Sequence, residues 1–107
     1  MTSIYSQSQE THQQELQQVA TGLKLADDEI EVTALETLRY GMMAMRNSES
    51  HQECKDISYA MHNIPEALSR RDFEFLRSST IEGQWAMWKI RSQKAALRSQ
   101  KVAHPAQ

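Results

Sequence analysis

The sequence holds few of the residues from which several common kinds of site are built. It contains one cysteine, three glycines and two prolines in 107 residues. A single cysteine permits no internal disulfide, which is typical of proteins in a reducing compartment. Three scattered glycines form no phosphate-binding loop. We therefore expect a cytoplasmic protein without a bound cofactor.

Long apolar runs and strand patterns are also missing. No stretch approaches the roughly 20 apolar residues of a membrane-spanning helix. The N-terminus has neither the basic start nor the apolar run of a secretory signal. No segment alternates apolar and polar residues in the manner of a half-buried strand. These absences predict an all-α protein without a membrane segment.

Two apolar stripes share one spacing. Steps of three, four and three residues place the members of each stripe on one helix face, which must be buried. The first stripe is Leu35, Leu38, Met42 and Met45, and the second is Cys54, Ile57, Met61 and Ile64. The connector, residues 47–50, is short enough to make the two helices antiparallel neighbours. The predicted fold is an all-α antiparallel hairpin, extended to a bundle of three or four helices, with weakly ordered termini.

Capping residues set the predicted helix ends. A serine or acid three residues before a glutamate forms a capping box. The pairs are Asp28 with Glu31, Ser50 with Glu53, and Ser79 with Glu82. They predict helices over 28–47 and 51–63, and a break or bend at 78–80 before a last helix. Pro65 starts a short helix over 65–70, and Asp72 caps the segment that follows.

Polarity divides the chain into three parts. Residues 1–22 are polar and predict either a disordered segment or a frayed helix. Residues 23–91 hold the predicted bundle, and residues 92–107 form a basic helical extension and tail. A core this small is marginally stable from burial alone, which favours a homodimer or an obligate protein partner.

The candidate metal and catalytic pairs are incomplete. His51 and Cys54 are three residues apart, but a structural zinc site needs four ligands, and no second pair accompanies them. Cys54 and His62 lie two turns apart on one predicted helix, roughly 12 Å and too far for a hydrogen bond. We predict no metal and no catalytic residue. An enzyme built around His62 is the third choice of function.

The candidate partner-binding residues are apolar and basic. Met43 falls outside the first stripe, and Trp85 and Trp88 are large aromatic residues of the kind that anchor cores or interfaces. At least one tryptophan is expected to be buried. Arg91, Lys94, Arg98 and Lys101 follow the spacing three, four, three and predict a basic ridge on one helix face. Such a ridge suits either a solvated surface or phosphate groups.

One short run resembles a known element. Tyr59 to Pro65 is similar to an alanine-x-His-Asn-aliphatic-Pro element in small uncharacterised bacterial helical proteins. The resemblance implies a helix that ends at a proline bend, and no function comes with it.

Taken together, these patterns predict a non-enzymatic protein–protein interaction module, such as a small regulator, adaptor or immunity-type protein. The alternative is a nucleic-acid-associated regulator that uses the basic C-terminal helix. The net charge of −2 counts against that alternative.

Overall fold

The computed structural model describes the chain from residue 2 to residue 103, and side-chain surroundings for residues 2–100. Within this range the chain forms five helices and no strand. The helices are α1 (Gln9–Thr21), α2 (Ile30–Arg46), α3 (His51–Met61), α4 (Ile64–Arg70) and α5 (Phe73–Ala103). The predicted all-α bundle is confirmed. No helix in the described range has the length and hydropathy that crossing a membrane requires.

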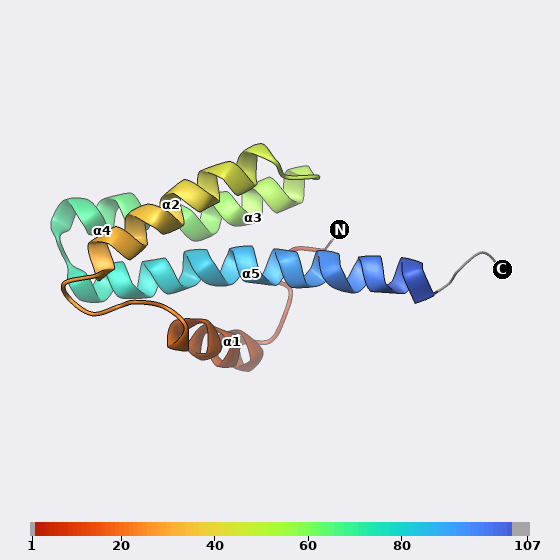
Figure 1. The fold of residues 1–107 in the computed structure, drawn as a ribbon, viewed down its shortest axis with the longest axis horizontal. Coiled ribbons are helices and arrows are strands. Elements are labelled where there is room, and N and C mark those ends of the chain that lie inside the picture. Colours follow the sequence, from red (N-terminus) through yellow and green to blue (C-terminus); the bar gives the residue numbers. More distant parts are fainter. Residues whose placement is uncertain (1, 104–107) are drawn as a thin grey trace.

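Helix α5 is the centre of the fold. Helices α2, α3 and α4 pack along one side of it, and α1 packs on the other (Figure 1). Its 31 residues are continuous, so the break predicted at residues 78–80 is wrong. Ser79 and Thr80 are buried within this helix. In the interior of a helix the backbone N–H groups are already hydrogen-bonded to carbonyl groups of the preceding turn. A serine at such a position therefore has no free N–H group to cap.

The predicted hairpin is formed by α2 and α3, which pack against each other (Figure 1). Its second helix starts as expected, because the Ser50 hydroxyl accepts a hydrogen bond from the Glu53 N–H at 3.1 Å. The Glu53 carboxylate in turn accepts one from the Glu49 N–H at 3.2 Å. Asp72 likewise caps the next turn by accepting from the Phe75 N–H. The capping box predicted at Asp28 is wrong, because Glu29 precedes α2 and makes no side-chain cap.

The two apolar stripes differ in how far they are buried. Ile57, Met61 and Ile64 of the second stripe are buried, as predicted. In the first stripe Leu38 and Met45 are partly buried against the core, but Leu35 is 56% exposed and Met42 is 65% exposed, so the burial predicted for these two is wrong. The residues of α2 that are buried are instead Ile30, Ala34, Thr37 and Gly41. This face is mostly small, and its smallness lets α2 approach its neighbours closely.

The N-terminal residues belong to the packed structure. Ile4 is only 2% exposed, and its N–H donates to the Asp56 carboxylate at 3.0 Å. The Ser3 hydroxyl donates to the same carboxylate at 2.9 Å. Residues 9–21, for which disorder and a frayed helix were both predicted, form α1, capped by Ser8. The core therefore draws on residues before position 23.

Candidate functional site

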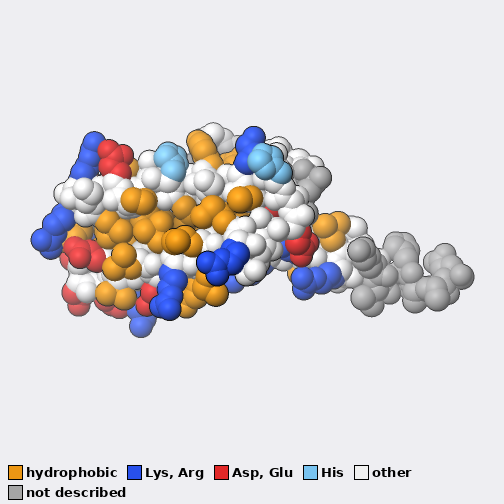
Figure 2. Space-filling view, turned by 90° about the horizontal axis from the view of Figure 1, so that it is seen from above, with side chains coloured by type: hydrophobic (Ala, Val, Ile, Leu, Met, Phe, Trp, Pro, Cys, Tyr) orange, Lys and Arg blue, Asp and Glu red, His pale blue; other side chains and the backbone are white. Residues whose placement is uncertain are grey.

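Exposed apolar side chains gather on one helix. Seven large hydrophobic side chains are exposed among the described residues, and five of them lie on α2. These five define the α2 outer face: Val32, Leu35, Tyr40, Met42 and Met43. Figure 2 shows hydrophobic side chains gathered on the side of the molecule formed by α2 and α3. Large exposed apolar patches mark sites that bind another surface.

Two arginines accompany the α2 outer face. Arg39 and Arg46 are exposed, and neither forms an ion pair with any described residue. Val32, Leu35, Arg39, Met42 and Arg46 follow one another at steps of three and four, so they lie along one line of the helix. The apolar line therefore carries two positive charges that the rest of the described chain does not neutralise.

A cleft lies beside the α2 outer face. It has a volume of about 400 Å³ and is bounded by α2, α3 and α5. Tyr40 belongs both to the outer face and to the lining of the cleft. The apolar part of the lining is Ala44, Ile57, Met87 and Ile90. Its size and composition suit one large apolar side chain, the kind of anchor that dominates many interfaces.

An ion pair borders this cleft. Lys94 Nζ lies 3.0 Å from Glu53 Oε2 and 3.6 Å from Glu49 Oε1. The Glu53 side chain is only 2% exposed, and its other oxygen, Oε1, has no hydrogen-bond partner among the described residues. Lys94 was predicted in the basic ridge, and here it is the counter-ion of a buried carboxylate.

The rest of the predicted ridge is exposed. Arg91 lines the cleft with an exposed side chain, and Arg98 is exposed further along α5. Neither makes an ion pair with a described residue. Lys101 lies in α5, but its side chain falls outside the described part. The ridge therefore presents two free arginines within the range that the structure describes.

The two tryptophans have different surroundings. Trp85 is fully buried, and its indole N–H donates to Glu15 Oε1 at 3.2 Å. The imidazole of His12 stacks on its ring at 4.2 Å between centroids. Trp85 is thus part of the core and has no surface to offer a partner. Trp88 is half-buried and shares a shallow hollow with Val19 and Leu23.

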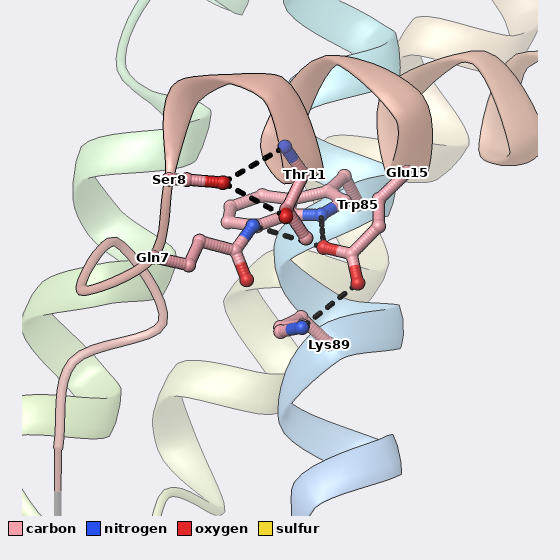
Figure 3. Close-up of polar contacts among 6 residues, drawn as sticks. All are labelled: Gln7, Ser8, Thr11, Glu15, Trp85 and Lys89. Atoms are coloured by element: carbon pink, nitrogen blue, oxygen red, sulfur yellow. Dashed lines mark hydrogen bonds and ion pairs between the residues drawn. The ribbon is translucent and has the colours of Figure 1, made fainter.

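Glu15 joins α1 to α5. Its carboxylate accepts hydrogen bonds from Lys89 Nζ at 2.8 Å, from Gln7 Nε2 at 2.9 Å and from the Trp85 indole (Figure 3). Burial opposes the charged form of this group, but the hydrogen bonds and the Lys89 charge outweigh burial and lower the pKa of Glu15. The paired carboxylate holds the N-terminal helix over Trp85.

The positions of His62 and Cys54 lend no support to the catalytic and metal sites considered from the sequence. His62 Nδ1 contacts the carbonyl oxygen of Tyr59 at the end of α3, which is a structural role at a helix terminus. Cys54 is a half-buried free thiol. No group of three or more His, Cys, Asp or Glu side chains that could hold a metal ion occurs in the described range.

No protein-family model matches the sequence, and no curated protein or solved structure matches it either. The resemblance in Tyr59 to Pro65 therefore stays a prediction, and the surface itself is the guide to function.

Sequence reasoning identified Met43 but missed most of the α2 outer face. It assigned Leu35 and Met42 to the core, and it left out Val32, Tyr40 and the two arginines. One signal was available in the sequence. The line from Val32 to Arg46 contains two arginines, whereas the parallel line Ile30, Ala34, Thr37 and Gly41 contains no charge. A charged residue within an apolar line indicates an exposed face.

Proposed function

We propose that this protein is a non-enzymatic interaction module whose α2 outer face binds an amphipathic helix of a partner protein. The observation that carries the proposal is the concentration of five exposed hydrophobic side chains on α2. Burying one such side chain is worth about 1.5–3 kcal/mol. Several together supply enough free energy to hold a helix in place against the cost of association.

The charges define the chemistry of the partner. Arg39 and Arg46 lie along the apolar line, and Arg91 lies at the adjacent cleft. A partner helix with an apolar face and acidic flanks would pair with these arginines. One large apolar residue of that helix would enter the cleft beside Tyr40. The single cysteine supports a reducing compartment, the cytoplasm, as the place of binding.

A second copy of this chain is a poorer occupant. In-register pairing of two α2 helices would bring Arg39 beside Arg39 and Arg46 beside Arg46. Like charges across an interface are destabilising. Nucleic acid is the other competitor, because Arg91 and Arg98 are free. The pairing of Lys94 with Glu53 removes one of the four phosphate contacts that the ridge predicted.

The test uses two synthetic helical peptides with the same leucine face, one flanked by glutamates and one by lysines. Fluorescence anisotropy at physiological salt should show tighter binding of the acidic peptide. Leu35→Ser should weaken that binding about tenfold or more. Leu97→Ser is the matched control, because Leu97 is an exposed leucine on α5 outside this face.

Three outcomes would contradict the proposal. Equal affinity for both peptides would remove the role of the arginines. A dimer in sedimentation that Leu35→Ser dissociates would make a second copy the occupant. Tight duplex binding that Arg91→Gln with Arg98→Gln abolishes would favour nucleic acid, with a log–log salt slope of about −1.8 for two contacts.

A further inference from the structure

A second pocket, separate from the α2 outer face, lies among the N-terminal segment, α1, α3 and α5. Its volume is about 450 Å³. Tyr5, His12, Tyr59 and Phe75 supply aromatic rings to its lining, and Ser79 and Glu82 supply polar groups. The proposed protein-binding role uses none of these residues.

Buried polar atoms without partners concentrate at this pocket. Five side-chain atoms in the described residues are buried without a hydrogen bond, and three of them belong to residues that line it. They are Tyr5 Oη, Ser79 Oγ and His12 Nε2, of which His12 Nε2 does have a charged neighbour, Glu82 Oε1, at 3.4 Å. Leaving such a group unpaired costs about 1–3 kcal/mol. The unpaired hydroxyls of Tyr5 and Ser79 at one pocket indicate a place where a polar ligand completes the hydrogen bonding.

The lining of the pocket holds one carboxylate and two histidines. No lysine or arginine is among its lining residues in the described range, and Glu82 contributes a carboxylate. Within the described chain Glu82 has one ion-pair partner, His12, whose Nε2 lies 3.4 Å from Glu82 Oε1. Nearby, Asp56 is buried, and its hydrogen-bond donors are the neutral groups of Ser3, Ile4 and Gln52.

Aromatic rings form the walls. The ring of Tyr5 meets that of Tyr59 edge-on, with centroids 5.2 Å apart, and Tyr59 lies 5.4 Å from His62. Burial, followed by the charge of Glu82, raises the pKa of Tyr5, so its hydroxyl stays neutral and can accept a hydrogen bond. Aromatic faces attract cations, and carboxylates pair with them.

We propose that this pocket binds a primary alkylammonium ion. An ammonium group carries three N–H donors. Glu82 would pair with its charge, and the oxygens of Tyr5 and Ser79 would accept its remaining N–H groups. The alkyl chain would lie against Tyr59 and Phe75. An anion would meet the Glu82 carboxylate and, in the described lining, no lysine or arginine, and a quaternary ammonium would bring no N–H donor to the unpaired oxygens.

The test is calorimetry of the full chain with butylammonium, tetramethylammonium and butyrate at constant ionic strength. Butylammonium should bind saturably at one site, tetramethylammonium about tenfold more weakly, and butyrate not at all. Glu82→Gln should weaken butylammonium binding about tenfold or more. Glu74→Gln is the matched control, because it removes an exposed glutamate from the same helix outside the pocket.

Ser79→Ala separates binding from folding. Because Ser79 Oγ has no partner in the free protein, the alanine variant should melt at the same temperature as the wild type or higher, yet bind butylammonium more weakly. Three results would overturn the proposal: no heat with butylammonium up to about 10 mM, comparable binding of butyrate, or equal affinities of Glu82→Gln and Glu74→Gln.

Discussion

Gly41 of α2 lies directly against Met61 of α3. A Cβ atom built on Gly41 would stand 2.6 Å from Met61 Cε. Met61 has little room to move away, because a Cβ on Gly83 of α5 would also lie 3.0 Å from its sulfur. One methionine therefore fills the space left by two glycines, and the three helices meet at this point.

This contact predicts the effect of Gly41→Ala. The higher helix propensity of alanine would gain about 1 kcal/mol, but overpacking costs about 1–3 kcal/mol, so we expect a net loss near 1 kcal/mol in urea unfolding. Met61→Ala alone should cost about 2–5 kcal/mol. The double variant should lose less than the sum. Gly22→Ala is the control, because its Cβ would meet only an ordinary contact at 3.8 Å. If the losses of stability of Gly41→Ala and Met61→Ala simply add in the double variant, the packing described here is contradicted.

A second prediction tests which stripe is buried. Ile57→Ala should destabilise the fold by about 2–5 kcal/mol, because Ile57 is 1% exposed. Leu35→Ala should change the free energy of unfolding by less than about 0.5 kcal/mol, as surface substitutions do. Chemical denaturation of the two variants side by side measures both values. A large loss at Leu35 would return the first stripe to the core.

The Glu53–Lys94 pair predicts an asymmetry along the basic ridge. Lys94→Gln leaves a buried carboxylate without its counter-ion and should cost about 3 kcal/mol. Arg98→Gln removes the same charge from an exposed position and should cost less than about 0.5 kcal/mol. Thermal melts at neutral pH decide between them. Equal, small effects would show that Glu53 is adequately solvated without Lys94.

The pKa of Glu15 predicts a dependence of stability on pH. Because folding lowers this pKa below its ordinary value of 4.5, the ionised carboxylate stabilises the fold above that value. The contribution is lost as the pH falls through the lowered pKa. Glu15→Gln should be less stable than the wild type at neutral pH, and the difference should shrink below about pH 4. Unfolding followed by tryptophan fluorescence at several pH values measures it; a constant difference would contradict the pairing.

Much of the architecture could be predicted from local signals. The hairpin could be predicted from its short connector. Ser50 and Asp72 indicated where two helices begin, and both helices begin there in the folded structure. The inward face of α2 could not be predicted in this way. Ala34 and Gly41 contribute close approach rather than apolar area, so they give a weak hydrophobic signal. The continuity of α5 was hidden by the polar, buried Ser79 and Thr80.

The candidate site was harder to predict than the fold. Trp85 and Trp88 are the same residue type three positions apart, so the sequence alone does not distinguish them. Trp85 is buried because α1 docks on α5 through Glu15. Lys94 belongs to a regular basic pattern, and only the fold shows that Glu53 lies opposite it. Both outcomes depend on contacts between residues far apart in the chain, about which periodicity carries no information.

Every other helix packs on α5, and this unequal sharing of contacts has an evolutionary consequence. A substitution on the inner side of α5 changes its contacts with several helices at once, whereas a substitution on an outer helix changes contacts with few. Sequence drift should therefore be slow along the buried side of α5 and faster on those outward surfaces of the surrounding helices that bind no partner. Those surfaces are free to acquire new binding preferences while the scaffold stays the same.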